Sequence, residues 1–293
     1  SILVSFTNVR ALAAVLILSY MAVPLLAFGA AALLFGLHSD YGVGLMVSAA
    51  APSTLASSII WTRLGKGNDA LALTGTMLTN IIAFITVPLI LQFALGSAVS
   101  LDPFGMGKKL FFTLLVPVIL GQVARAFNAS LSDRLKKPAS FVNRFIVLII
   151  ILSAVSSASV EAARKGASVS DIILVIIAVA VVHSAALLLG WFGGKFMGIA
   201  RPERVAISIT GSQKTLPVGA YIAENFFPAL AFAPIPVLLY HASQLVIDSF
   251  AIDVWKRAAN TSNDVNRTAA SSLLEDACSS GDAPTGSGRD CAG

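Results

Sequence analysis

The sequence predicts an all-α membrane protein with about eight transmembrane helices. Hydrophobic residues make up 56% of the 293 residues, charged residues make up 12%, and the mean hydropathy is +0.84. A soluble domain this poor in polar residues would expose large apolar patches. The apolar residues instead form repeated stretches of roughly the 20 residues that a helix needs to cross a bilayer. These stretches lack the alternation of polar and apolar residues that is typical of barrel strands.

Eight such stretches are expected to form one membrane-spanning helix each. They fall at 9–35, 42–62, 70–95, 108–127, 141–161, 169–197, 203–223 and 229–255. If the helices alternate in direction, fourteen of the 20 Lys and Arg residues lie in loops on one side and four on the other. The positive-inside rule places the richer side, and with it both chain ends, in the cytoplasm. We therefore expect a multi-pass protein of the inner (plasma) membrane. The cytoplasmic loops account for its excess of Lys and Arg over Asp and Glu, so no nucleic-acid partner is expected.

The chain is expected to divide into a transmembrane domain over 1–257 and a disordered cytoplasmic tail over 258–293. The composition of the tail turns polar and small, and such segments cannot bury enough apolar surface to fold. Cys278 and Cys291 both lie in this tail. A structural disulfide is not expected on the cytoplasmic side.

Two of the predicted helices are expected to be broken at mid-membrane depth. The stretch 42–62 carries Pro and hydroxyl residues at 52–58, and the stretch 203–223 carries the run GSQKTLPVG at 211–219. Gly and Pro free backbone groups there, and hydroxyls or amides can satisfy them. Interrupted spans at matching positions of two halves predict an inverted-repeat transporter with two discontinuous crossing helices. If 108–255 forms one five-helix repeat, the first repeat lacks about two N-terminal helices of an expected ten.

The polar residues at these breaks and on the neighbouring helices form the candidate solute site. The candidates are Ser53, Thr54, Ser57, Asn80, Ser212, Gln213, Lys214, Thr215, His241 and Gln244. Single Ser and Thr residues in membrane helices often only bond the preceding turn, whereas a cluster at two breaks favours a binding site. Half-helix N-termini beside the breaks would add partial positive charge for an anion.

Lys214 is the most informative of these residues. A charge near the bilayer centre costs at least about 2.5–3.5 kcal/mol, so the side chain needs a cavity or a partner. It could be neutral, pair with an acid, or bind an anion or a proton at the site. On the last helix, His241, Gln244 and Asp248 share one face that is expected to turn inward, and Asp248 could pair with Lys214 or a loop base. His183 is expected to be an interhelical hydrogen-bonding residue.

The sequence contains no motif for catalysis or for ATP-driven pumping. It has no His, Cys, Asp or Glu cluster with metal-ligand spacing, no P-loop, and none of the intramembrane hydrolase motifs. The protein is therefore expected not to be an enzyme and to have no catalytic residue, metal site or cofactor. Transport driven by a gradient remains by elimination, with sodium or a proton as the coupling ion.

Three stretches give the chain a resemblance to the bile acid:sodium symporter (SBF-like) family, particularly its bacterial branch of predicted sodium-dependent transporters. They are 51–68 running on to Asn80, 211–217, and 236–244, and the run 183–190 also fits. The resemblance spans residues 1 to about 257. It implies ten helices in a panel domain and a core domain. It also implies that 42–62 and 203–223 unwind and cross at the substrate site.

The same resemblance implies a sodium site near that crossing, formed in part by Ser58, Thr76 and Gln213. The acidic position of the family falls here on Ile209 and its Asn position near Ile59. Two oxygen ligands that suit a hard cation are therefore absent. Lys214 adds a positive charge nearby. We hypothesise that sodium coupling is weakened or replaced, with Lys214 substituting for the ion or carrying a proton.

Other functions stay open at this point. A passive facilitator or channel could use the same fold. A retinal-binding photoreceptor would need a mid-membrane lysine for its Schiff base, but the chain has only 3 Trp residues and the helix count does not fit. Hydroxyls, an amide and a lysine among apolar residues suit a small organic anion, such as a carboxylate, a sterol conjugate or a sulfated solute. The sequence does not indicate the exact solute, the direction of transport or the oligomeric state.

Overall fold

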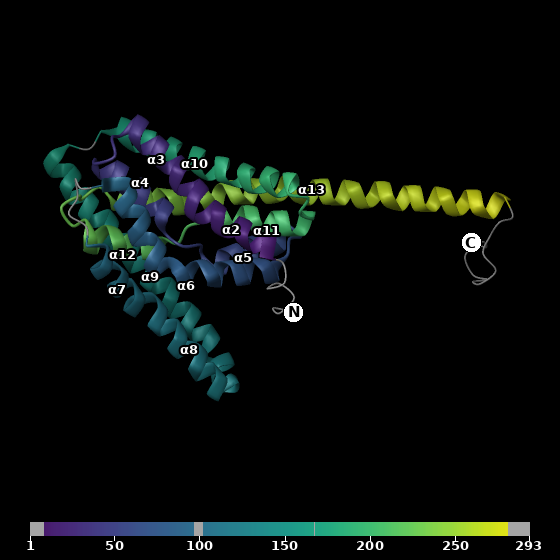
Figure 1. Ribbon diagram of the computed structural model, residues 1–293, viewed down its shortest axis with the longest axis horizontal. Helices are drawn as coiled ribbons and strands as arrows, with labels where there is room; N and C mark the ends of the chain where they lie inside the picture. The colour runs from purple at the N-terminus through teal and green to yellow at the C-terminus, as the bar shows by residue number, and fades with distance from the viewer. Residues whose placement is uncertain (1–8, 97–101, 167, 281–293) are drawn as a thin grey trace. The chain divides into compact units, whose positions relative to one another are not determined.

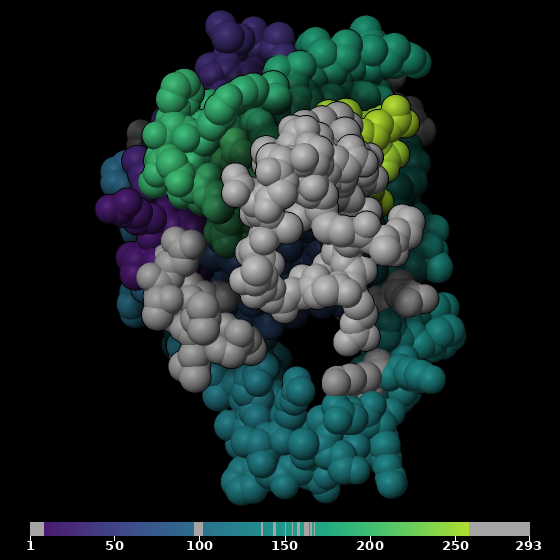
Figure 2. All heavy atoms as spheres, turned by 90° about the vertical axis from the view of Figure 1, so that its right-hand side faces the viewer, coloured from purple at the N-terminus to yellow at the C-terminus, as the bar shows by residue number. Residues whose placement is uncertain are grey.

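The computed structural model describes residues 9–96, 102–166 and 168–280. The chain forms two compact units, Ser1–Ser249 and Phe250–Gly293, and each is considered by itself. Side chains beyond 257, and a few within α9, are not described (grey in Figure 2). The described residues form helices joined by turns, with no strand among them. The all-α prediction is confirmed for this part of the chain.

The helices follow one another with short connections (Figure 1). In order they are α2 (Val9–Ile17), the π-helical η1 (Leu18–Ala22), α3 (Val23–Leu34), α4 (Asp40–Ala50), α5 (Leu55–Leu64), α6 (Asp69–Leu95), α7 (Pro103–Leu110), the π-helical η3 (Phe111–Leu115), α8 (Val116–Phe127), α9 (Ala129–Lys165), α10 (Val169–Phe196), α11 (Arg201–Ser212), α12 (Leu216–Phe226) and α13 (Pro234–Ser280).

Polar caps in the sequence fix several of the helix starts. The side chains of Ser39, Asn68, Asp102 and Ser168 each accept a hydrogen bond from a backbone N–H in the first turn of α4, α6, α7 and α10. Such caps satisfy one of the donors that a helix leaves unpaired at its N-terminus. The helix α6 ends where Gly96 takes a φ of 62°, which a residue without a Cβ adopts readily.

Five helical segments are long and apolar enough to cross a membrane. They are Val9–Leu34, Asp69–Leu95, Pro103–Phe127, Val169–Phe196 and Pro234–Arg257. The pair α4 and α5, bent by 66° at its break, raises the number to six among the described residues. The stretches 141–161 and 203–223 are helical, within α9 and α11–α12, but do not meet this test. Their crossing of the membrane, and so the count of eight, stays a prediction.

The surface of these spans is apolar, as expected for contact with lipid. Leu33 on α3, Phe93 on α6 and Val181 on α10 are among the large apolar side chains that the structure leaves exposed. In water such a surface would drive aggregation. In a bilayer it is the surface that the hydrocarbon core requires. The structure therefore agrees with a multi-pass membrane protein.

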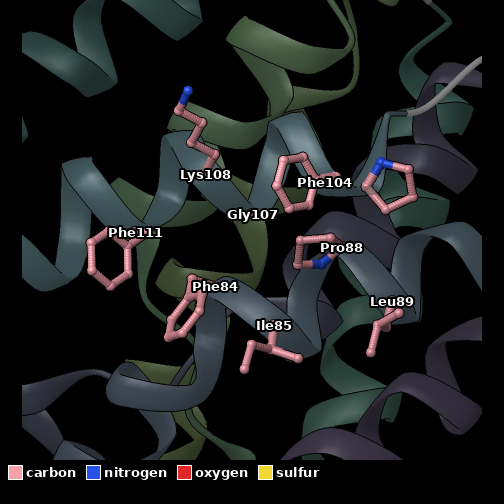
Figure 3. A pocket seen from close by; sticks show the side chains of 9 residues that line it. Phe84, Ile85, Pro88, Leu89, Phe104, Gly107, Lys108 and Phe111 are labelled. Atoms are coloured by element: carbon pink, nitrogen blue, oxygen red, sulfur yellow. The ribbon is translucent and has the colours of Figure 1, made fainter.

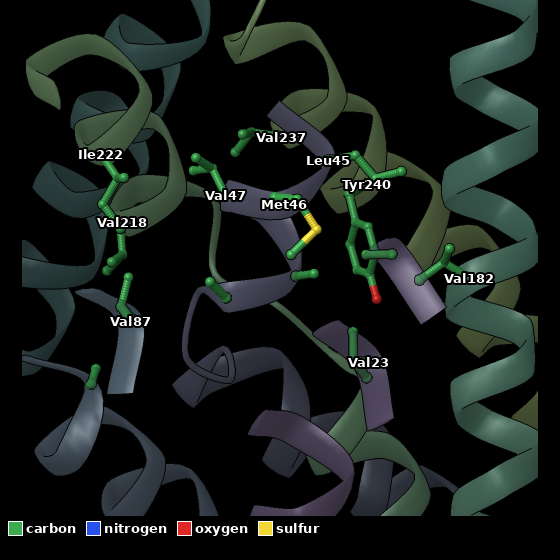
Figure 4. Packing of buried hydrophobic residues seen from close by; sticks show 14 of the residues in the cluster. Val23, Leu45, Met46, Val47, Val87, Val182, Val218, Ile222, Val237 and Tyr240 are labelled. Atoms are coloured by element: carbon green, nitrogen blue, oxygen red, sulfur yellow. The ribbon is translucent and has the colours of Figure 1, made fainter. Parts of the chain in front are cut away.

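The interior is packed around α4, which is buried from Gly42 to Ala50. Figure 4 shows Met46 of α4 and Val182 of α10 on either side of the Tyr240 ring of α13, within one cluster of buried side chains. The helix α10 packs along both α11 and α3. This arrangement brings α4, α10, α11 and the start of α13 around a common centre, where both broken helices lie.

An apolar groove lies away from that centre. It has a volume of about 490 Å³ and runs between α6 and α7 (Figure 3), and its lining includes Phe84, Pro88, Phe104 and Phe111. Lys108 is the only charged residue that lines it, and none of the predicted site residues does. An apolar groove of this kind suits lipid chains better than a polar solute.

The helix α13 continues through residues 258–280, which the sequence assigns to the polar tail. The predicted disorder of that tail and the domain boundary at 257 stay predictions. The side chain of Cys278 is not described, and Cys291 lies outside the described residues.

Candidate functional site

The two predicted breaks exist and lie against each other. The break between α4 and α5 spans 51–54, and the break between α11 and α12 spans 213–215. The backbone N–H of Thr215 donates to the carbonyl oxygen of Pro52 at 2.9 Å. The Thr54 hydroxyl donates to the carbonyl oxygen of Lys214 at 3.0 Å. We call these two segments the break site.

Two helix N-termini meet at the break site. Thr54 is the N-cap residue of α5 and Thr215 that of α12, and neither side chain caps its own helix. The first backbone N–H groups of a helix have no partner within it, and they carry partial positive charge. Two such termini converge here at a point where a solute with negative charge would be stabilised.

The main chain of Lys214 is held by the last helix. The amide of Gln244 accepts from the Lys214 N–H at 2.8 Å and donates to the Lys214 carbonyl oxygen at 3.0 Å. A broken helix inside a membrane must satisfy its freed backbone groups with protein partners. Gln244 performs this task at the second break, which explains why a buried amide is needed on that face of α13.

The side chain of Lys214 reaches the first span rather than an acid. Its Nζ donates to the Ser19 carbonyl oxygen at 2.6 Å and lies 3.0 Å from the Ser19 hydroxyl. It also lies 5.5 Å from the centre of the Tyr20 ring, within the range of a cation–π contact. The side chain is buried, with 2% of its surface exposed.

The last helix contributes a chain of hydrogen bonds that ends at a histidine. The Ser57 hydroxyl donates to Gln213 Oε1 at 2.9 Å, and Gln213 Nε2 donates to Asp248 Oδ2 at 2.5 Å. Asp248 Oδ1 lies 2.9 Å from His183 Nε2 on α10, and both side chains are fully buried. His183 is therefore the interhelical partner that the sequence predicts. The expected pairing of Asp248 with Lys214 or a loop base is wrong, because donors from α10 and from the break take up both carboxylate oxygens.

The ten candidate residues separate by burial into two sets of five. Half-buried are Thr54, Ser57, Asn80, Thr215 and His241, and buried are Ser53, Ser212, Gln213, Lys214 and Gln244. Most of the buried set has internal partners: the Ser212 hydroxyl, for example, donates to the Ser208 carbonyl oxygen one turn back. The Ser53 hydroxyl is the exception, since it has no hydrogen-bond partner among the described residues. A buried polar group without a partner indicates a water or ligand that would satisfy it.

The half-buried residues line the break site from three helices. Asn80 of α6 donates to the Ser53 carbonyl oxygen at 3.0 Å. His241 of α13 lies 2.9 Å from Gln244 through its Nδ1. Together with Thr54, Ser57 and Thr215 they offer hydroxyl, amide and imidazole groups around the two helix N-termini.

Each of the three positions implied for sodium has a hydrogen-bond partner in the structure. Ser58 lies 2.9 Å from the Thr210 hydroxyl, and Thr76 donates to Ser58 at 3.3 Å. Gln213 turns instead to Ser57 and Asp248. Ile209, at the acidic position of the family, is fully buried. The hydroxyl cluster therefore contains no carboxylate, whereas hard cations in proteins favour sites that include one.

The sequence alone missed three residues of this centre. Thr210 completes the hydroxyl cluster, and Ser19 and Tyr20 enclose the Lys214 ammonium. A signal was present for the last two, since they are the only hydroxyl-bearing residues of the apolar stretch 11–35. No group of three or more His, Cys, Asp or Glu residues that could hold a metal occurs in the described part of the chain.

Comparison with known proteins gives the family. A model described as the SBF-like CPA transporter family matches residues 1–257. Uncharacterized protein PA2026 of Pseudomonas aeruginosa is 27% identical over 211 residues, which are 70% of this chain and 62% of that protein. The probable sodium/metabolite cotransporter BASS4, chloroplastic, of Oryza sativa subsp. japonica is 31% identical over 234 residues, 74% of this chain and 55% of that one. Sodium/bile acid cotransporter 7 of Danio rerio is 28% identical over 213 residues, 70% and 62% of the two chains.

The chain thus spans less than two thirds of the length of these relatives. A family of transporters agrees with the expectation that the protein is not an enzyme, and it does not favour a retinal-binding photoreceptor. The predicted resemblance is confirmed by a match that extends over nearly all of the described residues. The chain belongs to the SBF-like CPA transporter family.

Proposed function

We propose that this chain is a secondary transporter that carries a small organic anion across the inner membrane. The observation that supports it best is the meeting of two broken helices, with the N-termini of α5 and α12 at the break site. Broken spans near the bilayer midplane are where secondary transporters bind their solutes. The names of two relatives, a sodium/bile acid and a sodium/metabolite cotransporter, agree with a small organic solute.

In this proposal the solute contacts the half-buried polar set. Its carboxylate or sulfate lies against the N-termini of α5 and α12. On binding, the Ser57 hydroxyl exchanges its present acceptor, Gln213 Oε1, for the solute. Asn80 likewise exchanges one of its two carbonyl acceptors, those of Ser53 and Thr76. The unpartnered Ser53 hydroxyl is available to the same solute or to a water beside it. The other four buried residues stabilise the conformation of the break and do not contact the solute directly.

Sodium coupling is weakened or replaced in this proposal. The hydroxyls of Ser58, Thr76 and Thr210 bond to one another, and Ile209 supplies no charge. The positive charge inside the site comes instead from Lys214. A coupled carrier would then use a proton or another gradient.

The proposed arrangement is eight of the ten helices of an inverted-repeat fold, over 1–257, with both ends of the chain in the cytoplasm. The two breaks at matching places support the repeat, and the uneven distribution of Lys and Arg supports the orientation. The candidate helices that meet the length and hydropathy test are five of these eight, or six with the bent pair.

The experiment is a solute screen on the purified chain followed by transport in proteoliposomes. Carboxylates, sterol conjugates and sulfated solutes are tested for thermal stabilisation, first in sodium and then in potassium, because stabilisation follows occupancy. A stabilising anion is expected to accumulate above its equilibrium level in the vesicles when a proton gradient is imposed. Uptake that stops at equilibrium would mean a passive facilitator. A chain that binds and moves no anion would refute the proposal.

Matched variants tie that transport to the break site. Ser57→Ala is expected to lower anion affinity about five-fold or more. A hydrogen bond to a charged group contributes about 1.5–3 kcal/mol, and the neutral bond to Gln213 that it replaces contributes about 0.5–1.5 kcal/mol. Ser159→Ala is the control, because the exposed Ser159 hydroxyl donates to the Val155 carbonyl oxygen of its own helix. Equal affinity losses in both variants would exclude Ser57 from the solute site.

A further inference from the structure

The Lys214 ammonium lies in a small cage on the first span. The cage is made by the Ser19 carbonyl oxygen, the Ser19 hydroxyl and the face of the Tyr20 ring. The Tyr20 hydroxyl donates to the Thr79 carbonyl oxygen at 2.6 Å, which fixes the ring in place. A carbonyl oxygen, a hydroxyl oxygen and an aromatic face are groups that attract a cation.

The local backbone explains why this carbonyl is free to accept a cation. In the π-helical turn η1 the N–H of Val23 donates to the Leu18 carbonyl oxygen, five residues back. Val23 would be the partner of Ser19 in a regular α-helix, and so it is already used. The next residue, Pro24, has no N–H to offer. Lys214 therefore donates to a Ser19 carbonyl oxygen that has no backbone donor within its own helix.

The cage matches an ammonium group and is already full. An ammonium has three donors and no acceptor, and its surroundings here are two oxygens and a ring face. π-turns inside helices are frequent at functional sites. Meanwhile Gln244 and Thr54 hold the Lys214 main chain at the break. One residue thus joins the break site, the first span and the last helix.

We propose that Lys214 is a tethered cation, held in the Ser19–Tyr20 cage, which balances the charge of the solute anion in place of a free coupling cation. This inference rests on the proposed function, because it assigns the charge balance of the same site. A fixed charge beside the break acts through a medium of low dielectric constant, where it stabilises an anion more strongly than it would in water. The consequence is a site that needs no sodium to hold its anion.

The test removes the lysine side chain from the cage by substitution and measures whether small cations stabilise the resulting variant, with no solute present. The purified chain is melted at equal ionic strength in chloride salts of sodium, potassium, ammonium, methylammonium and N-methylglucamine. The native chain is expected to melt at the same temperature in all five. Lys214→Ala is expected to melt lower and to recover at least about 2 °C in ammonium or methylammonium relative to N-methylglucamine. Lys108→Ala, which removes an exposed lysine, should show no such recovery.

Two results would overturn the tethered cation. One is a native chain that sodium stabilises over N-methylglucamine, and the other is a Lys214→Ala variant that does not distinguish the small cations. If Lys214→Ala does not fold, equilibrium binding of radioactive sodium to the native chain decides: saturable binding refutes the inference, and its absence supports it. Because no solute is used, the melting test can contradict the tethered cation while anion transport in proteoliposomes still succeeds. It can also support the tethered cation when no anion is transported, so the two failures are distinguishable.

Discussion

Gln244 holds the backbone of the second break from the last helix. Its amide pairs with both the N–H and the carbonyl oxygen of Lys214. A glutamine is suited to this because it is donor and acceptor at once. The position of Lys214 therefore depends on this side chain of α13 together with the Thr54 hydroxyl of the first break.

Replacing Gln244 with alanine should destabilise the protein. The buried Lys214 N–H would lose its partner, the Lys214 carbonyl oxygen would lose one of two donors, and an unsatisfied buried group costs about 1–3 kcal/mol. The free energy of unfolding, measured by denaturant titration in mixed micelles, is expected to fall by at least that amount. Ser249→Ala on the same helix is the control, because the Ser249 hydroxyl bonds only the Val246 carbonyl oxygen one turn back. Equal losses for the two variants would contradict the role given to Gln244.

The Asp248–His183 contact should behave as one coupled unit. Both side chains are fully buried, and Asp248 also accepts from Gln213. Removing either partner leaves the other without its hydrogen bond in a site that water does not reach. In a double-mutant cycle of Asp248→Ala and His183→Ala, the interaction free energy is expected to be about 0.5–3 kcal/mol. Strictly additive changes in unfolding free energy would show that the contact contributes nothing.

At the scale of elements, small residues allow α10 and α11 to approach the first span. A Cβ added to Gly190 would lie 2.7 Å from the Ser208 Cα atom and 2.8 Å from the Leu18 side chain. A Cβ on Gly211 would lie 2.6 Å from the same leucine. Leu18 is the first residue of η1, so these two glycines let the helices pack tightly beside the π-turn that frees the Ser19 carbonyl.

Two glycines of α10 should respond in opposite directions to alanine. Gly190→Ala forces the backbone of α11 to move, and such overpacking costs about 1–3 kcal/mol. Gly193→Ala meets nothing within 4 Å, and it should be neutral or stabilise the helix by about 0.4–1 kcal/mol. Thermal unfolding of both variants in the same detergent checks the pair. A Gly193 variant that loses as much stability as the Gly190 variant would refute the close packing.

At the scale of the whole molecule, the arrangement across the membrane can be read with single cysteines. In a background with Cys278 and Cys291 replaced by serine, Lys108→Cys and Lys195→Cys each place one thiol at an exposed position. The predicted orientation puts residue 108 outside and residue 195 in the cytoplasm. A membrane-impermeant maleimide is expected to label Lys108→Cys in intact cells, and Lys195→Cys only after permeabilisation. The opposite pattern would invert the topology.

The sequence by itself determined the fold class, the position of both breaks and the family. Apolar stretches of membrane length predict the helices. The Pro and Gly residues at 52 and 211–219 interrupt two of these helices, whatever the tertiary packing around them. These features are local: each depends on a residue and its neighbours in the chain. The count of membrane spans was less secure, because α9 and the pair α11–α12 do not meet the test that five other segments meet.

The partners of the charged groups were decided only by the tertiary structure. The sequence allowed Lys214 an acid, an anion or a proton, and it placed Asp248 near Lys214. Packing instead turned Asp248 toward His183 and Gln213, and it brought Ser19 to the ammonium from 195 positions away in the chain. The physical reason is that a buried charged side chain forms hydrogen bonds with the polar groups that tertiary packing places beside it. That group can belong to any helix, and no spacing in the sequence specifies which one.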